Sequence, residues 1–238
     1  EMYSIAIISN RPKVLFKKSY SKIIKPSNLE SKCIIYCPKS ERKEMDKLFP
    51  NIKKVNVRLG VKYALIDARL TWKDGEAIVK MDDDISAIKH LVGKKLKTIK
   101  NTGKVFEMMF KNMKQRKARL GGFYPTPNEL WMSKAKPISE NLTFIYGACF
   151  CMFFVKDIKY KLDGKSDYER SILYFINDGK VLRFNKFSLV SKYRGETSSN
   201  SDKEENDFLI KKYGKYISRI KYNKDGLTSI IFKNVGKK

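Results

Sequence analysis

Three consecutive carboxylates, Asp82, Asp83 and Asp84, form the motif with the clearest chemical use in this chain. Adjacent acids repel one another and resist burial, so they need a cation, N–H donors or open water. Alternate side chains of an extended segment point the same way, which lets Asp82 and Asp84 converge while Asp83 faces elsewhere. Two carboxylates with several waters suit Mg²⁺ or Mn²⁺, which can bridge phosphate oxygens. The alternative is a solvated acidic turn.

A second pair of acids, Asp167 and Glu169, opens a predicted helix late in the chain. Acidic side chains are favoured in the first turn of a helix, because they interact with the helix dipole and its unpaired N–H groups. On the residues alone, a helix cap therefore competes with any chemical role for this pair.

Strands and helices alternate in the first half of the chain, which is typical of a mostly parallel sheet with crossover helices. The predicted elements are, in order, a strand over 3–8, a strand over 33–36, a strand over 55–57, a helix over 61–72 and a strand over 77–81. The acid triplet follows the last of these strands directly. Ligands of open α/β sheets bind beyond the carboxyl ends of the strands, so we expect the triplet at a ligand site.

The second half is less regular and strongly basic. Residues 89–119 hold eleven Lys or Arg against the single acid Glu107. We expect a basic helix over 104–119. We also place His90, the only histidine, on a basic helix. The remaining predictions are a loop or strand edge over 121–127, one or two central strands over 144–155, a helix over 167–177, a strand over 180–190, a polar, mobile segment over 198–207, and a hairpin of 220–222 with 230–232 around Asp225-Gly226.

The chain of 238 residues carries 51 basic and 25 acidic side chains, a formal net charge of +26. The codon bias of an AT-rich genome explains the excess of Lys over Arg but not the excess of Lys over Glu. We therefore expect a polyanionic partner, which could be nucleic acid, an anionic membrane face or a phosphorylated ligand. A merely soluble basic surface is the alternative. The aromatic content of 12% excludes a disordered polyelectrolyte.

No apolar run reaches the roughly 20 residues that span a bilayer, and the longest covers 148–155. The opening residues lack a signal-peptide pattern. The cysteines Cys33, Cys37, Cys149 and Cys151 lie in apolar surroundings without the C-x₂-C spacing of common zinc sites. We expect buried free thiols in a reducing compartment, and hence a cytoplasmic, non-secreted protein.

Three segments resemble the successive donor-site elements of the GT-A glycosyltransferases. They are residues 7–11 (Ile-Ile-Ser-Asn-Arg), 66–69 (Ile-Asp-Ala-Arg) and 79–84 (Val-Lys-Met-Asp-Asp-Asp), of which the last resembles the DxD motif. The resemblance covers most of residues 1–190. Arg69 before the acid motif, the later Asp-Tyr-Glu and the small basic domain are most similar to the TET/JBP-associated, base-J-type glycosyltransferases of phages and viruses. Those enzymes are expected to attach sugars to hydroxymethylated DNA bases.

The resemblance implies a role for each donor-side residue. Ser9, Asn10 and Arg11 would contact the nucleoside of a nucleotide-sugar, with a plain turn as the alternative. Arg69 would lie across the donor diphosphate, where a planar guanidinium suits phosphate oxygens. The alternative for Arg69 is a cation that stabilises the carboxyl end of its helix.

The residues of the acid triplet would bind both the sugar and the metal. Asp82 or Asp83 would hold the ribose or the sugar, and Asp82 and Asp84 are the candidate ligands of Mn²⁺ or Mg²⁺. Many GT-A proteins add a late histidine as a third ligand, but we expect His90 to be structural or a phosphate neighbour. Metal binding would then rest on the triplet, the diphosphate and water.

The position of Asp167 resembles the element that supplies the general base in inverting GT-A enzymes. A carboxylate there would take the proton of the acceptor hydroxyl as its oxygen attacks the anomeric carbon. Asp167 is the first candidate and Glu169 the second. The acid that usually precedes this Asp is Ser166 here, which leaves the choice of base open.

These observations predict an α/β fold: a GT-A-like, Rossmann-type, mostly parallel sheet with flanking helices and a small basic C-terminal hairpin. We expect a single domain over 1–238, in which 1–100 bind the nucleotide-sugar, 101–195 bind the acceptor, and 196–238 form a polar linker and a basic extension.

The predicted function is a metal-dependent transfer of a hexose, with glucose favoured, from a UDP-sugar to a hydroxymethylated pyrimidine in phage or viral DNA. One alternative is a GT-A enzyme that acts on a glycan, lipid or protein acceptor. A second is a non-catalytic, basic nucleic-acid-binding protein. The sequence does not distinguish inversion from retention, and it leaves the oligomeric state open.

Overall fold

A computed structural model describes residues 3–191, 199–223 and 228–235. The strands are β1 (Ser4–Ile8), β2 (Cys33–Pro38), β3 (Lys53–Val57), β4 (Ala77–Met81), β5 (Ile85–Val92), β6 (Lys95–Thr98), β7 (Leu120–Tyr124), β8 (Ile138–Ser139), β9 (Cys149–Phe153), β10 (Leu182–Ser191), β11 (Ile217–Tyr222) and β12 (Thr228–Phe232). The helices are α1 (Pro12–Leu15), the π-helix η1 (Phe16–Ile24), α2 (Arg42–Leu48), α3 (Val61–Arg69), α4 (Thr102–Gln115), α5 (Glu129–Lys134), α6 (Ser166–Asp178) and α7 (Ser199–Tyr213), with short 3₁₀ turns at Lys25–Ser27, Glu30–Lys32, Lys39–Glu41 and Gly214–Tyr216.

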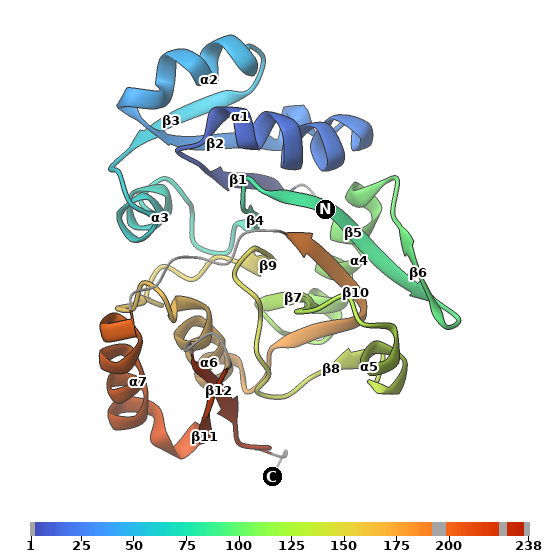
Figure 1. The fold of residues 1–238 in the computed structure, drawn as a ribbon, viewed down its shortest axis with the longest axis vertical. Coiled ribbons are helices and arrows are strands. Elements are labelled where there is room, and N and C mark those ends of the chain that lie inside the picture. Colours follow the sequence, from blue (N-terminus) through green and yellow to red (C-terminus); the bar gives the residue numbers. More distant parts are fainter. Residues whose placement is uncertain (1–2, 192–198, 224–227, 236–238) are drawn as a thin grey trace.

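One ten-stranded sheet joins the strands of the first 191 residues, in the order β3-β2-β1-β4-β9-β7-β10-β5-β6 with β8 paired to β10 (Figure 1). Its first four strands are parallel neighbours, and they match the strands predicted at the four corresponding positions. Their apolar side chains are buried on both faces, which is the pattern of a covered parallel sheet. The carboxyl ends of β1 and β4 therefore meet at one edge of the sheet.

The other half of the sheet is mixed. β9 runs antiparallel to both β4 and β7, β10 is parallel to β7, and β5 is antiparallel to β10. The α/β fold is thus confirmed, with the parallel character concentrated in the N-terminal half. One core, on the face covered by η1 and α4, includes Ile23, Phe106 and Met113. The core on the opposite face, below α3 and α6, includes Ala68 and Tyr174.

The Gly pair at the start of the predicted loop or strand edge lies in the central strand β7. A Cβ on Gly121 would come within 2.6 Å of Met113 Sδ, and one on Gly122 within 2.5 Å of Ile145 Cγ2. The two glycines therefore let the strand pack closely on both faces, and Phe123, which follows them, is fully buried. Trp131, on the following helix α5, is 57% exposed.

The placement of His90 on a basic helix is wrong. His90 lies in β5, where it pairs with Lys97 of β6 and stacks on Phe187 of β10 at a centroid distance of 4.4 Å. Gly93 closes the β5–β6 turn with a φ of 62°, a conformation that glycine adopts without strain. The predicted basic helix is confirmed as α4, which begins at Thr102, well after His90, and ends at Gln115.

The polar segment predicted over 198–207 belongs, from Ser199 onward, to helix α7. The helix places Leu209 and Tyr213 in a third core cluster with Ile172 of α6, and tertiary packing thus fixes a segment whose composition suggested a linker. The predicted hairpin is confirmed in its strands, since β11 pairs antiparallel with β12. Its Asp225-Gly226 turn lies outside the described residues.

The four cysteines are free and buried, as predicted. Burial raises the pKa of Cys33, Cys149 and Cys151, which keeps these thiols protonated. No helix in the described part of the chain is long and apolar enough to cross a membrane.

Candidate active site

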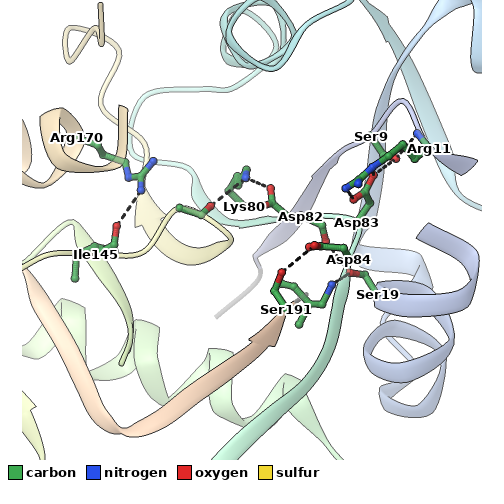
Figure 2. Close-up of polar contacts among 12 residues, drawn as sticks. Ser9, Arg11, Ser19, Lys80, Asp82, Asp83, Asp84, Ile145, Arg170 and Ser191 are labelled. Atoms are coloured by element: carbon green, nitrogen blue, oxygen red, sulfur yellow. Dashed lines mark hydrogen bonds and ion pairs between the residues drawn. The ribbon is translucent and has the colours of Figure 1, made fainter. Parts of the chain in front are cut away.

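The acid triplet occupies the short connection between β4 and β5, at the sheet edge where β1 also ends. The backbone N–H of Asp82 donates to the carbonyl of Ala148 at 2.7 Å, which ties the triplet to the segment before β9. Figure 2 shows that the side chains of Asp82 and Asp83 point to opposite sides. Asp83 and Asp84 form a turn, so the extended backbone predicted for the triplet is wrong.

Asp83 is held by the residues that follow β1. Asp83 is 3% exposed. Its carboxylate accepts hydrogen bonds from Ser9 Oγ at 2.7 Å and from the Arg11 guanidinium, whose Nε lies at 3.1 Å (Figure 2). Ser9 Oγ also accepts the backbone N–H of Arg11 at 3.0 Å. The structure thus brings together three of the predicted donor-side residues, while Asn10 is exposed beside them.

Asp82 is paired with a buried lysine that sequence reasoning missed. The Lys80 ammonium, on a residue that is 7% exposed, contacts the Asp82 carboxylate and donates to the Gly147 carbonyl at 3.0 Å. Burial raises the pKa of Asp82, and the charge of Lys80 opposes that shift. Lys80 therefore joins the end of β4 to the glycine before β9.

Asp84 faces the end of β10. Its carboxylate accepts a hydrogen bond from Ser191 Oγ at 2.9 Å, and Ser191 also bonds to Tyr146. Burial, above all, raises the pKa of Tyr146 to about 12, and three nearby carboxylates add to the shift. These carboxylates are those of Asp82, Asp84 and Asp167. We call these three carboxylates the acid site.

The π-helix η1 contacts the backbone of the triplet through Ser19. Ser19 Oγ donates to the carbonyl of Asp82 at 2.7 Å and accepts the N–H of Ile85 at 3.0 Å. A fully buried hydroxyl thus satisfies two backbone groups of a connection that has no ladder partners there. π-Helical turns are rare and often occur at functional sites.

Asp82 and Asp84 are an incomplete ligand set for a metal ion. Within the described residues, no group of three or more His, Cys, Asp or Glu side chains is arranged to hold a metal on its own. Two hard carboxylates two residues apart nevertheless fit Mg²⁺ or Mn²⁺ when substrate phosphates and water complete the shell. The residues present therefore fit a metal that arrives with its nucleotide.

Asp167 lies in the first turn of helix α6, and its carboxylate accepts the N–H of Tyr168 at 2.9 Å. Burial raises its pKa, and the neighbouring guanidinium of Arg170 opposes the shift. A Cβ on Gly147 would lie 3.5 Å from Asp167 Cβ and 3.8 Å from Arg170 Nη2. Gly147 therefore lets the backbone pass close to this carboxylate.

Glu169 has a different environment although it is two residues away. It is fully buried and accepts the N–H groups of Lys161 at 2.6 Å and Leu162 at 3.0 Å. Tyr213 of α7 donates to its other oxygen at 3.1 Å, and Lys212 lies 3.9 Å away. Glu169 therefore holds a loop against α6 and α7, and the structure gives it no contact with the triplet among the described residues.

Arg69 also serves a structural contact in this structure. Its guanidinium donates to Tyr160 Oη at 2.8 Å and to the carbonyls of Val155 and Ile158, and it lies over the ring of Phe154 at 4.8 Å. No hydrogen bond or ion pair joins it to the triplet in the described ranges. Arg69 anchors α3 to the segment that follows β9.

Arg170 is the second buried cation that sequence reasoning missed. It is 2% exposed, lies 3.8 Å over the ring of Phe150 and donates to the carbonyl of Ile145 at 3.1 Å, while its Nε has no hydrogen-bond partner among the described residues. The sequence did place Arg170 beside Asp167, because two residues three apart on one helix lie on the same face.

A cavity of about 810 Å³ lies elsewhere, where Gly75 precedes β4 and Arg119 faces Asp178. It contains none of the predicted site residues. The opposite ends of β4 thus carry different features: the cavity at its start and the acid triplet at its carboxyl end.

No protein-family model matches the sequence, and no curated protein matches it. Solved structures do resemble the fold. A mannosyltransferase from Pyrobaculum calidifontis, in complex with GDP-Man and Mn²⁺, superposes with a TM-score of 0.57 at 12% identity over 90% of this chain, which spans 63% of the mannosyltransferase. A mycobacterial protein superposes with a TM-score of 0.54 at 9% identity, covering 97% of this chain and 83% of that protein.

Glucosyl-3-phosphoglycerate synthase from Mycobacterium tuberculosis, in complex with Mn²⁺, UDP-glucose and phosphoglyceric acid, gives a TM-score of 0.50 at 11% identity. The match covers 98% of this chain and 88% of that enzyme. At such identities the likeness confirms the GT-A-like α/β fold alone.

Proposed function

We propose that this chain is a metal-dependent glycosyltransferase that moves a hexose from a UDP-sugar to a hydroxymethylated pyrimidine in phage or viral DNA. One observation carries the enzyme class. Lys80 pairs with Asp82 and donates to the carbonyl of Gly147, and Gly147 borders Asp167. Asp82 and Asp84 follow β4 directly, at the carboxyl edge of the sheet. This is the edge at which open α/β sheets bind ligands. Two of the similar structures contain Mn²⁺ with GDP-Man or UDP-glucose, which supports the metal and the class of donor.

The donor would be bound from two sides. Arg11 is held rigid by Asp83 and Ser9 directly after β1, which suits it to contact the nucleoside. Asp82 and Asp84 would hold a divalent ion on the donor diphosphate. When bound, the ion supplies positive charge to the leaving phosphate oxygen.

Transfer would need a base on the acceptor side, and Asp167 is the candidate. Its carboxylate takes the proton of the acceptor hydroxyl while that oxygen bonds to the anomeric carbon. The bond from the anomeric carbon to the phosphate oxygen breaks, and UDP leaves with its electron pair. Burial raises the pKa of Asp167, which makes the carboxylate a stronger base.

The net charge of +26 supports an extended polyanion as the acceptor. UDP, glucose and a hydroxymethylated base follow from the family resemblance. A target base in a duplex would have to leave the stack to reach Asp167, because stacking hides it from a site within the protein.

The decisive experiment is a matrix of UDP-sugars against DNA that contains cytosine, hydroxymethylcytosine or hydroxymethyluracil, with nucleoside mass as the readout. We expect a hexose mass shift on a hydroxymethylated base. Transfer to a glycan without any mass shift on DNA would refute the acceptor. DNA binding without turnover of any UDP-sugar would favour a non-catalytic DNA-binding protein.

The metal assignment has its own test. Asp84→Ala should lower Mn²⁺-dependent release of UDP by about 1,000-fold, roughly 4 kcal/mol of barrier, because it removes half of the protein ligands. DNA affinity should remain nearly unchanged. Asp46→Ala on the exposed face of α2 is the charge-matched control, and it should release UDP at the wild-type rate. Equal activity of Asp84→Ala and Asp46→Ala would remove Asp84 from the metal site.

A further inference from the structure

The β5–β6 hairpin is a basic ribbon at one end of the large sheet. Residues 89–100 contain five lysines and His90 but no acidic residue. Lys94, Lys95 and Lys97 are exposed, and within the described residues no ion pair joins them to an acid. The positive charge of this ribbon is therefore open to a partner from outside.

The opposite edge of the sheet provides a contrast. The edge strand β3 carries Lys54, whose ammonium pairs with Asp46 of α2 at 3.3 Å and also contacts the carbonyl of Phe49. Lysines on edge strands commonly prevent unwanted strand pairing, and a neutralised lysine such as Lys54 does not need a polyanion. Among the described residues, Glu129 contacts the ribbon through the backbone N–H of Leu96, and no ion pair like that of Lys54 joins an acid to Lys94, Lys95 or Lys97.

The ribbon starts at the acid site. Ile85, the first residue of β5, follows Asp84 directly, and the eight residues of β5 lead outward over about 26 Å at roughly 3.3 Å per residue. Figure 1 shows the hairpin reaching outward at the β6 end of the sheet. A chain of phosphates along this ribbon would therefore have one end near Asp84.

The ribbon is held rigid along its length. Glu129 of α5 accepts the N–H of Leu96 at 2.8 Å, and Leu91 opposite is 6% exposed. His90 stacks on Phe187 with ring planes 4° apart. A rigid ribbon loses little conformational entropy when it binds, so its lysines are pre-organised for phosphates.

We propose that the β5–β6 ribbon binds the sugar-phosphate backbone of a nucleic acid and leads it toward the acid site. Its role in presenting an acceptor rests on the proposed function, whereas the binding does not. Two-stranded ribbons fit the major groove of DNA, and lysines neutralise phosphates. A membrane is disfavoured because Val92, at 44% exposure, is the only large apolar side chain exposed on the described ribbon, and interfacial segments present several such side chains.

The test compares two triple variants that each remove three charges. The ribbon variant is Lys94→Gln, Lys95→Gln, Lys97→Gln, and the control is Lys39→Gln, Lys43→Gln, Lys47→Gln at exposed positions near the opposite edge of the sheet. The probe is an unmodified 20-base-pair duplex, titrated by fluorescence anisotropy over a series of salt concentrations. We expect the salt slope of the ribbon variant to fall by about 2.7, because each phosphate contact contributes about 0.9. The control should change the slope by less than about 1.

Lysine acetylation with and without the duplex provides a second measurement that no folding defect can mimic, because it uses the wild-type protein. We expect protection at Lys94, Lys95 and Lys97 but not at Lys39 or Lys43. Equal loss of affinity in both variants, protection at neither set, or binding of phosphatidylserine vesicles in place of DNA would overturn the proposal. Ribbon-dependent DNA binding by a protein that turns over no UDP-sugar would support the ribbon and refute the proposed function.

Discussion

Two regions of the molecule contain buried or partly buried carboxylates, and they use them differently. At the junction of α6 with α7 and β12, Glu169, Asp202 and Glu205 each accept several hydrogen bonds from the protein. Glu205 accepts three consecutive backbone N–H groups, those of residues 163–165, and Asp202 pairs with the Lys165 ammonium at 2.5 Å and accepts the N–H of Thr228. Glu169 is bound in the same way. These acids hold the C-terminal elements in place.

At the acid site, Asp82 and Asp167 accept fewer hydrogen bonds from the described residues. Asp82 pairs with Lys80, and Asp167 accepts the N–H of Tyr168. Burial raises the pKa of both, whereas at the junction the donors around Asp202 outweigh burial and lower its pKa. Half-buried carboxylates whose pKa is raised, such as Asp82 and Asp167, are candidates for chemistry, and those whose pKa is lowered by donors support the fold.

The largest expected effect that distinguishes the regions is that of Asp167→Asn. We expect the rate of sugar transfer to fall by about 10²–10⁴-fold, because the amide cannot take a proton. Donor binding should be retained and the melting temperature should not fall, since the change removes a poorly compensated charge. The measurements are transfer rate, donor affinity and thermal unfolding of the same preparation. Transfer at the wild-type rate would remove Asp167 from the mechanism.

The counterpart at the junction is Glu169→Gln. An amide keeps the shape but replaces one acceptor oxygen with a donor, in a place where every neighbour donates. We expect the free energy of unfolding to fall by about 2 to 3 kcal/mol, measured by denaturant titration. Transfer per folded molecule should stay within a few-fold of wild type. Lost transfer at full stability would place Glu169 in the chemistry and end the distinction between the regions.

The pH dependence of the transfer rate and of stability should distinguish the two regions by a smaller effect. The raised folded-state pKa of Asp167 means that its ionised form weakens the fold at neutral pH, so acidification through that pKa slows transfer while adding stability. The pKa of Asp202 is lowered, so its contribution to stability is present above its unfolded value of about 3.9 and is lost as the pH falls through the folded value. We expect transfer to fall by up to about tenfold per pH unit on its acid limb, before stability declines.

Rate profiles and thermal unfolding between pH 3 and pH 8 provide the measurement. Asp202→Asn should lower stability at neutral pH and flatten its acid dependence without moving the rate profile. Coincident loss of rate and stability in the wild type would show that unfolding, and not Asp167, causes the acid limb.

The parallel half of the sheet could be predicted from the sequence, because its strands are continuous apolar runs between turn residues and the triplet follows one of them. The β5–β6 hairpin could not, because a lysine-rich segment has neither helical nor strand periodicity and only Gly93 indicated its turn. Helix α7 is fixed by contacts with α6 rather than by its own apolar pattern. A long-range contact also explains why Lys80 was missed as a member of the site, because its partner Gly147 is 67 residues away.

The smallest expected effect is that of a methyl group added at Gly147, beside Asp167. Gly147→Ala would place a methyl group 3.5 Å from Asp167 Cβ, an ordinary van der Waals distance, so stability should change by less than about 1 kcal/mol. The methyl group narrows the space beside the proposed base, and we expect the acceptor KM to rise several-fold while the donor KM stays constant. Gly122→Ala is the matched control: its Cβ would meet Ile145 Cγ2 at 2.5 Å, which should cost about 1 to 3 kcal/mol of stability without a selective change in acceptor KM. If both variants changed only stability, the acceptor would approach Asp167 from a side that Gly147 does not border.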